Sequence, residues 1–394
     1  MTKNLFVVPL GALVIVGGAV LSGCGIQDAS PPIPAQNHSA SKAAVTGASP
    51  LENAKTIVMV SRTTGWASSS NQIFRTTSSG KKWVSVLKSS AILTMDAVTS
   101  KTAWVVTHDG AHEVILSHTH DGGVHWATHT LHASWSVAQA QVYVTTHSAD
   151  GSFGSVLLSG PVGMQTGPQA LWTISQGHVS SAPVYTTAHG AFAAIVWTSS
   201  TRAWAISDGA GSPALMDSTN GGESWSPVAL PLPNWVPPKA MNNPHPQLQA
   251  SLKTFQPPTF VDGVGYLSTT LNVPHIGSQN IVKYHNYAVL YKTTSGTIWT
   301  PIWTRANASL VSLDWTTSQD GWGIVAKGHQ VQLDHTSTSG HTWQDVSTLA
   351  ATIHPLSVKF FSQTGWIVSQ STQANTLSLW QSHNSGKQWQ VVHE

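Results

Sequence analysis

Six short segments of this chain place a Gly three residues before a Trp, in turns rich in Ser and Thr. We call each segment a box, and the boxes span residues 76–83, 119–126, 218–225, 293–299, 336–343 and 382–389. Their Gly and Trp residues are Gly80 and Trp83, Gly123 and Trp126, Gly222 and Trp225, Gly296 and Trp299, Gly340 and Trp343, and Gly386 and Trp389. Such self-similarity predicts a fold built from repeated units.

Strand patterns surround the boxes. Upstream of most boxes an aromatic residue follows a small one, and we call it the marker: Trp66, Trp104, Trp204, Tyr266, Trp322 and Trp366. Apolar and polar residues alternate before the marker, as in Ala91–Val98, between marker and box, as in Glu113–Ser117, and after the box Trp, as in Trp83–Leu87. This alternation predicts four short antiparallel strands in each unit, with the box joining the third to the fourth.

The marker spacing sets the number of units. Successive markers lie 38 residues apart at the start of the chain and 44 at the end, but Trp104 and Trp204 lie 100 apart. A weakly marked unit fills this interval, with Gln141–Thr145 and Ser155–Ser159 as inner strands and Leu171–Ile174 as the last strand. The sequence therefore predicts an all-β propeller of seven four-stranded blades over residues 53–394.

Each box has the chemistry of a tight hairpin turn. The position two before the Gly holds Ser78, Asp121, Asn220, Thr338 or Asn384, and Ser295 is its nearest equivalent in the shorter fourth box. These side chains can bond nearby backbone N–H groups, and the Gly permits a positive φ. We expect the Trp to fold back and seal its blade against the next one, burying about 150–250 Å².

The boxes resemble Asp-box (BNR) repeats, which occur in sialidases, sortilin-type receptors and the photosystem II assembly/stability factor family. The resemblance covers about residues 55–393, and segments such as Phe74–Trp83 are closest to the last group. It implies a propeller whose boxes lie on the rim, away from any active site, and by analogy a role in assembling membrane proteins. Only Asp121 keeps the Asp of the motif.

The N-terminus resembles the signal of bacterial lipoproteins. Lys3 precedes an apolar run, Leu5–Val20, which is followed by Leu21-Ser22-Gly23-Cys24. The resemblance implies a signal peptide over residues 1–23 and lipidation of Cys24, which would attach the protein to a membrane; an ordinary secretory signal or an uncleaved anchor is the alternative. Each reading places the protein outside the cytoplasm. The Ala-, Ser- and Pro-rich residues after Cys24 predict a flexible tether, so that the lipidated Cys and tether occupy 24–52.

The composition of the chain indicates which classes of partner to expect. Only 9% of residues are charged and the formal net charge is +2, so we expect no nucleic-acid partner. The chain has 20 His, which would gain positive charge below a pH of about 6.5. An acidic external medium is one hypothesis for this bias, and compositional drift is the other. No cofactor motif is present, and we expect a monomer.

A sialidase-like glycosidase is the enzymatic alternative. Such an enzyme would need several Arg to hold a substrate carboxylate, but the chain offers only Arg62, Arg75, Arg202 and Arg305, in unmatched contexts. Glu113 is the lone acidic candidate, without a paired carboxylate nearby. We therefore expect no catalytic residues. His118 and His120 are weak candidates for a metal site because alternate strand residues share a face, and ordinary surface histidines are the competing interpretation.

Two insertions in the fifth unit, about 231–258 and 272–288, are the candidate recognition loops. They contain Trp235, Tyr284 and Tyr287, residue types suited to contact with a peptide or glycan. A poorly ordered excursion, or Trp235 packing over its own blade, is the alternative. The sequence thus predicts a membrane-anchored, extracytoplasmic scaffold that binds or assembles a protein partner, with a glycoside hydrolase or a glycan- or peptide-binding receptor as alternatives.

Overall fold

A computed structural model provides the structure. The chain divides into two units, Met1–Gln36 and Asn37–Glu394. The structure describes residues 50–144, 153–161, 167–175, 178–185, 191–207, 213–237, 241, 249–276, 282–350, 353–371 and 376–393, all in the second unit. Within these residues, no helix has the length and apolar character needed to cross a bilayer. Cys24 lies outside the described residues.

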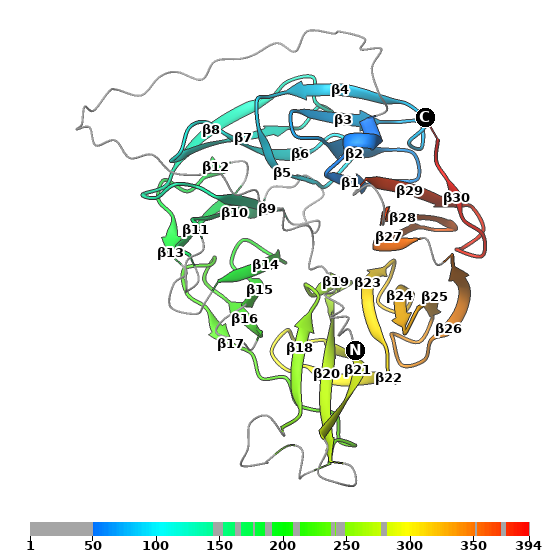
Figure 1. The fold of residues 1–394 in the computed structure, drawn as a ribbon. Coiled ribbons are helices and arrows are strands. Elements are labelled where there is room, and N and C mark those ends of the chain that lie inside the picture. The colour runs from blue at the N-terminus through cyan, green and yellow to red at the C-terminus, as the bar shows by residue number, and fades with distance from the viewer. Residues whose placement is uncertain are drawn as a thin grey trace, which may run out of the picture. The chain divides into compact units, whose positions relative to one another are not determined.

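Seven antiparallel sheets follow one another round a ring in chain order (Figure 1). The first two blades are β1 (Thr56–Met59), β2 (Gly65–Ser68), β3 (Gln72–Thr76) and β4 (Trp83–Lys88), then β5 (Ile92–Ala97), β6 (Ala103–His108), β7 (Glu113–Thr119) and β8 (Ala127–His132). The third and fourth are β9 (Gln139–Val144), β10 (Phe153–Ser159), β11 (Gln169–Ser175), β12 (His178–Val179) and β13 (Val184–Tyr185), then β14 (Phe192–Trp197), β15 (Ala203–Ser207), β16 (Ala214–Ser218) and β17 (Ser226–Pro227).

The fifth blade contains β18 (Ser251–Phe255), β19 (Thr259–Val261), β20 (Val264–Ile276), β21 (Val282–Thr293) and β22 (Thr300–Ala306). The last two are β23 (Ser309–Trp315), β24 (Gly321–Lys327), β25 (Gln330–Thr336) and β26 (Gln344–Leu349), then β27 (His354–Phe361), β28 (Thr364–Gln370), β29 (Leu377–Ser382) and β30 (Gln390–Val391). In the third and fifth blades one of the four strand positions is shared by two fragments. The structure confirms the predicted seven-bladed, four-stranded propeller.

The third blade differs from its prediction in one strand. Leu171–Ile174 lies in β11, which is the third strand and not the last. The outermost position is taken by β12 and β13, which both pair with β11. This blade has no box, and β12 begins only three residues after β11 ends at Ser175. Because no box Trp anchors a fourth strand, the outer strand forms in two short pieces.

Hydrogen bonds inside each box explain its sequence. In all six boxes the hydroxyl of the first residue, a Thr or Ser, accepts the N–H of the box Gly at 2.9–3.1 Å. Asp121, Asn220 and Asn384 each accept an N–H four residues further on at 3.0 Å. The six box Gly have φ between 72° and 88°, a left-handed region that disfavours other residues. The box is therefore a self-contained hairpin turn.

The box tryptophans pack against the preceding blade, not against the next blade as predicted. The described residues form seven apolar clusters, one in each interface between blades, and six of them include or touch a box Trp. Trp126 of the second blade, for example, joins the cluster that contains Trp66 and Ile73 of the first, and its Nε1 donates to the carbonyl of Val86 at 3.1 Å. Markers such as Trp66 face the following blade. Each boxed blade therefore contributes its box Trp to the interface with the preceding blade and its marker to the interface with the following one.

The ring closes through side chains, since no described strand is exchanged between the first and last blades. Trp83, Leu51 and Ala54 of the first blade share an apolar cluster with Trp366 and Leu379 of the last. A short 3₁₀ helix, η1 (Pro50–Asn53), precedes β1, and Leu51 is buried within it. The packed chain thus begins before residue 53, inside the segment predicted as the end of the tether.

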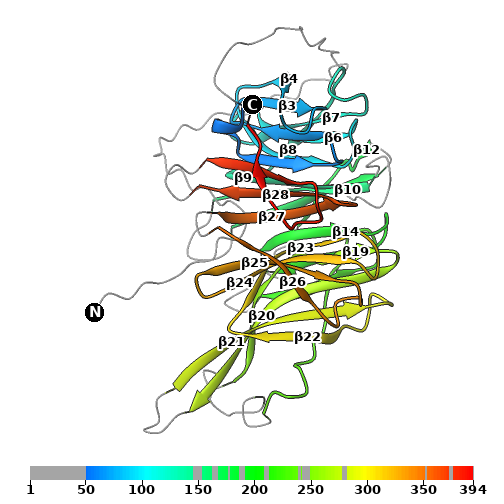
Figure 2. The ribbon, with the colours of Figure 1, turned by 90° about the vertical axis from the view of Figure 1, so that its right-hand side faces the viewer.

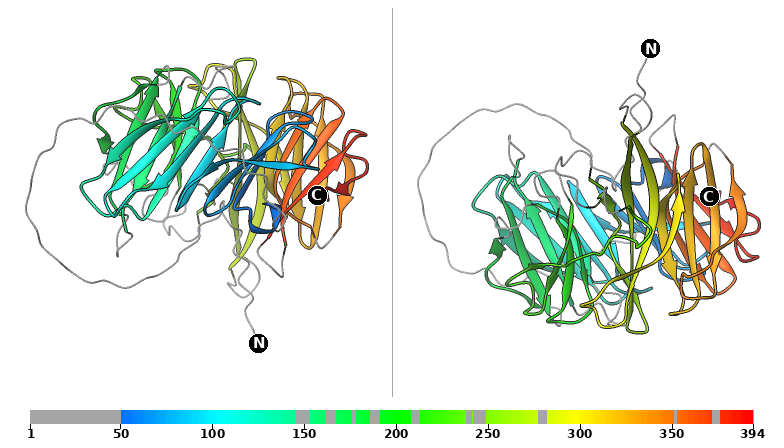
Figure 3. Two further views of the ribbon diagram at one scale, coloured as in Figure 1. Left: turned by 90° about the horizontal axis from the view of Figure 1, so that it is seen from above. Right: turned by 90° about the horizontal axis from the view of Figure 1, so that it is seen from below.

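The insertion at 272–288 is a β-hairpin extension and not the predicted loop. β20 and β21 pair continuously from Gly265↔Thr293 to Ile276↔Val282. The pairing of β18 with β20 ends at Asn272, and that of β22 with β21 ends at Tyr287. Beyond these residues the hairpin is a two-stranded ribbon that projects past the other blades (Figures 2 and 3). Pro274 lies within β20 beyond the end of its pairing with β18, and a Pro fits there because the strand has an open edge.

Candidate binding surfaces

The fifth blade presents an aromatic pair at its surface, in which Trp235 is exposed and Tyr287 is half-buried. Trp235 lies in the Pro-rich segment between β17 and β18, and its ring lies 4.5 Å from that of Tyr287 on β21. The neighbouring Val236 is buried in the cluster between the fourth and fifth blades, and Tyr291 donates to the carbonyl of Pro231 at 2.8 Å. These contacts fix the segment onto the blade, while Trp235 remains 40% exposed. Trp235 thus packs over its own blade and still faces solvent.

The hairpin separates the aromatic residues that the sequence grouped together. Side chains alternate across a strand, so Tyr287 shares a face with His285, Lys283 and the cross-strand His275, and the two His rings lie 5.8 Å apart. We call Trp235, Tyr287, His285, His275 and Lys283 the aromatic surface.

Tyr284 lies on the other face of the hairpin. It is 50% exposed and pairs across the ribbon with Pro274. Asn272 and Asn286 share this face and are bonded to each other at 2.8 Å. The structure therefore brings Trp235 and Tyr287 together and places Tyr284 apart from them.

The histidine candidates form a cluster on the second blade. His118 is buried and its ring stacks on Trp104 at 4.4 Å; His120 and His129 lie 5.0 and 5.8 Å from it. Burial, with smaller contributions from the charges of His120 and His129, lowers the pKa of His118 to about 4. In the part of the chain that the structure describes, no three His, Cys, Asp or Glu are arranged to hold a metal ion. With its lowered pKa, His118 is neutral near pH 7 and packs against Trp104.

Four of the five residues considered for glycosidase chemistry have partners within the fold. Arg75 donates to the carbonyl of Ser100 at 2.8 Å. Arg202 is paired with Asp217 at 2.8 Å and Arg305 with Asp334 at 2.6 Å. Glu113 lies 3.0 Å from His132. These side chains stabilise contacts within and between blades.

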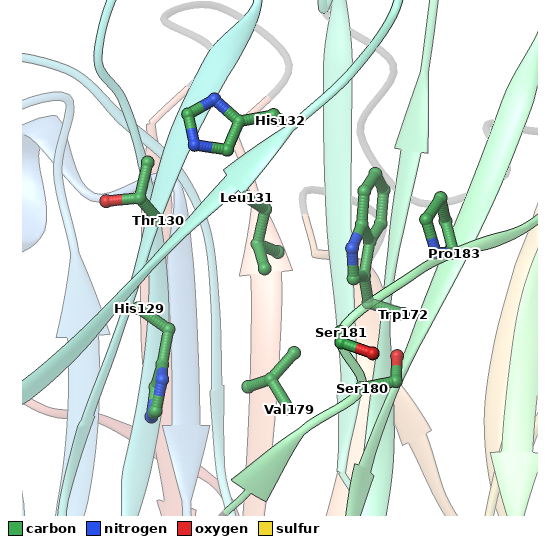
Figure 4. A pocket seen from close by; sticks show the side chains of 9 residues that line it. All are labelled: His129, Thr130, Leu131, His132, Trp172, Val179, Ser180, Ser181 and Pro183. Carbon is green, nitrogen blue, oxygen red and sulfur yellow. The ribbon is translucent and has the colours of Figure 1, made fainter. Parts of the chain in front are cut away.

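A cavity lies between the second and third blades (Figure 4). Its volume is about 280 Å³. The nine residues that line it come from β8, from β11 and from the segment containing β12 and its continuation, and they are His129, Thr130, Leu131, His132, Trp172, Val179, Ser180, Ser181 and Pro183. Trp172 and Leu131 are buried, whereas Thr130, His132 and Ser181 are exposed, so the cavity opens at the rim. Sequence reasoning did not predict this cavity.

Comparison with known proteins supports the fold alone. No protein-family model matches the sequence, and neither does any curated protein. Among solved structures, a GH74 xyloglucanase from Xanthomonas campestris is similar with a TM-score of 0.51 and 13% identity, over 90% of this chain and 54% of that one. The uncharacterized protein lmo1340 from Listeria monocytogenes matches with a TM-score of 0.51 and 8% identity, over 83% and 94%.

YCF48, a protein named in the complex "YCF48 bound to D1 peptide", has a TM-score of 0.46 and 17% identity, over 76% of this chain and 81% of that one. This chain spans about half the length of the xyloglucanase chain. Because propellers host unrelated activities, likenesses at such low identity establish the β-propeller fold of this chain and nothing about its activity.

Proposed function

We propose that this protein is a non-catalytic scaffold that is anchored to a membrane through lipidated Cys24, lies outside the cytoplasm and binds a protein partner through the aromatic surface. The observation that carries the proposal is the pair of Trp235 and Tyr287, held in contact on a rigid blade with Trp235 40% exposed. The sequence resemblance to lipoprotein signals supports the anchor.

The chemistry of the aromatic surface favours a protein partner. Trp and Tyr are enriched among the residues that dominate binding energy at protein interfaces. Trp235 is already fixed by its contact with Tyr287 and by the buried Val236 beside it, so binding would order few additional side chains. Lys283, His275 and His285 add polar and positively charged groups along the same face.

The absence of a catalytic role is supported by the arginines and by Glu113. Three of the four Arg that a carboxylate-binding site would require are engaged by Ser100, Asp217 and Asp334. Glu113 is engaged by His132 at 3.0 Å, whereas glycoside hydrolysis ordinarily needs two facing carboxyl groups that both act on the substrate.

The two faces of the hairpin allow a controlled test. The full-length, lipidated protein is isolated from native membranes after chemical crosslinking, and partners are identified by mass spectrometry. Trp235→Ala is expected to reduce partner recovery by at least about tenfold, the usual scale of a strong interface contact. Tyr284→Ala, on the opposite face and similarly exposed, is the matched control and is expected to leave recovery unchanged.

Three results would contradict the proposal. Equal losses in both variants would show that the aromatic surface is not the recognition face. Turnover of fluorogenic glycosides by the purified protein would contradict a non-catalytic role. Absence of acylation at Cys24 by mass spectrometry would remove the anchor without affecting the binding surface.

A further inference from the structure

The interface between the second and third blades departs from the repeat on both of its sides. The third blade has no box, so the apolar cluster that the described residues form in this interface contains no box Trp. On the facing strand, the residue three positions after the box Trp is His129; in the other five boxed blades this position holds an apolar, β-branched residue, namely Val86, Val228, Ile302, Val346 and Val392. The two departures meet in one interface.

The apolar residue at this position normally packs against the next box. A Cβ added to Gly123 would lie 2.6 Å from Val86, and one added to Gly340 would lie 3.1 Å from Ile302. Val86 also accepts the Nε1–H of Trp126 on its backbone carbonyl at 3.1 Å. His129 occupies the equivalent position on β8, and it lines the 280 Å³ cavity. The cavity therefore begins at the level where a box Trp lies in the neighbouring interface.

The lining of the cavity suits an uncharged ring. Trp172 and Leu131 form an apolar wall, and Thr130, Ser181, His129 and His132 supply polar groups toward the opening. None of the nine described residues that line it is Lys, Arg, Asp or Glu, and the lining residue His132 is already paired with Glu113. Burial and the nearby His178 lower the pKa of His129, which keeps its ring uncharged near pH 7.

We propose that this cavity, which we call the rim cavity, receives a Trp or Tyr side chain from a partner polypeptide. The fold itself places an aromatic ring at this level between other blades, and the volume is near the lower end of ligand pockets, about 300 Å³, so one ring system fits and an oligomer does not. Trp and Tyr combine an apolar ring with a polar tip, which matches an apolar wall below polar side chains. The site is separate from the aromatic surface of the fifth blade and does not depend on it.

The test uses the full-length protein and small probes for the side chain. Saturation-transfer NMR is recorded with N-acetyl-tryptophanamide and N-acetyl-tyrosinamide, and with N-acetyl-leucinamide as the non-aromatic control. We expect the aromatic amides to bind with a dissociation constant on the order of 0.1–1 mM and the leucine amide to give no signal. Ser181→Trp, at the opening of the cavity, is expected to weaken binding at least about tenfold.

Ala182→Trp is the matched control because Ala182 is the exposed neighbour that does not line the cavity. It is expected to bind like the unmodified protein, and circular dichroism verifies that both variants are folded. Binding of the leucine amide, equal binding by the Ser181→Trp and Ala182→Trp variants, or binding of N-acetylglucosamine in place of the aromatic amides would overturn the proposal. Trp235→Ala is expected to leave this binding unchanged, which separates failure here from failure of the proposed function.

Discussion

The interface between the first and second blades and the interface between the second and third are built from the same repeat but end differently. In the first, Trp126 fills the space beside Val86 and donates a hydrogen bond to it. In the second, the box is missing, His129 replaces the apolar residue and a cavity remains. In a repeat fold each unit is stabilised by packing against its neighbours. A cavity in one interface is therefore a candidate binding site.

The largest effect is expected from removing the Trp126 side chain from the interface between the first and second blades. Trp126→Ala deletes a buried indole and leaves a cavity in its place. We expect a loss of about 3–5 kcal/mol in the free energy of unfolding. Trp172→Ala, beside the existing cavity, is expected to cost about 1–2 kcal/mol less because part of its surroundings is already empty. Denaturant titration of both variants measures the difference, and equal losses would contradict the contrast between the interfaces.

The next largest effect concerns the close approach of a box Gly to the preceding blade. Gly123→Ala forces a side chain onto a residue with φ of 88° and places its Cβ 2.6 Å from Val86. We expect a loss of about 2–4 kcal/mol from backbone strain and overpacking together.

Gly110 provides the matched control for this substitution. Its φ is 91° but an added Cβ would meet nothing within 4 Å. Gly110→Ala is therefore expected to cost about 1–2 kcal/mol from backbone strain alone. If thermal or chemical unfolding gave the two variants the same stability, the box Gly would not be a packing contact.

A pH effect is expected on the histidine side of the open interface. The pKa of His118 is about 4 in the folded protein, below its ordinary value of 6.5, so between these pH values the unfolded chain binds a proton that the folded protein does not. Stability from this residue is complete above pH 6.5 and declines as the pH falls toward 4, by at most about 3 kcal/mol.

The pH effect is measured as the difference between the unmodified protein and His118→Gln, since other His titrate in both. We expect the unmodified protein to lose more stability between pH 7 and pH 4.5 than the variant does. A parallel pH dependence of the two proteins would contradict a buried, neutral His118.

A stability maximum near neutral pH would also argue against the hypothesis of an acidic external medium.

The smallest effect is expected from filling the open interface. Ser181→Trp introduces an indole at the cavity mouth, and we expect a gain of about 0.5–1 kcal/mol over Ala182→Trp. Differential scanning calorimetry can resolve the change in melting temperature. A lower stability for the Ser181→Trp variant would indicate that the cavity does not accept an aromatic ring.

Local turn chemistry made much of the fold predictable. A Thr or Ser hydroxyl on the Gly N–H, and a polar side chain closing the turn, involve residues at most four positions apart, so the sequence of a box is sufficient to specify a hairpin. The marker spacing then gave the number of blades, including the weakly marked third one. The insertion at 272–288 was predicted as a recognition loop, but cross-strand pairing, such as that of Pro274 with Tyr284, makes it a hairpin.

By itself, the sequence determined the repeated hairpins, their number and the aromatic residues of the fifth blade, because these depend on neighbours along the chain. Only the tertiary structure decided that each box Trp faces the preceding blade, that Trp235 meets Tyr287 while Tyr284 lies on the opposite face, and that His129 faces a cavity. The first and third of these features depend on how one sheet packs against the next around the ring, and the second depends on strand pairing within the fifth blade and on the segment that packs over it. Each feature joins residues far apart along the chain, so no short stretch of sequence contains both partners.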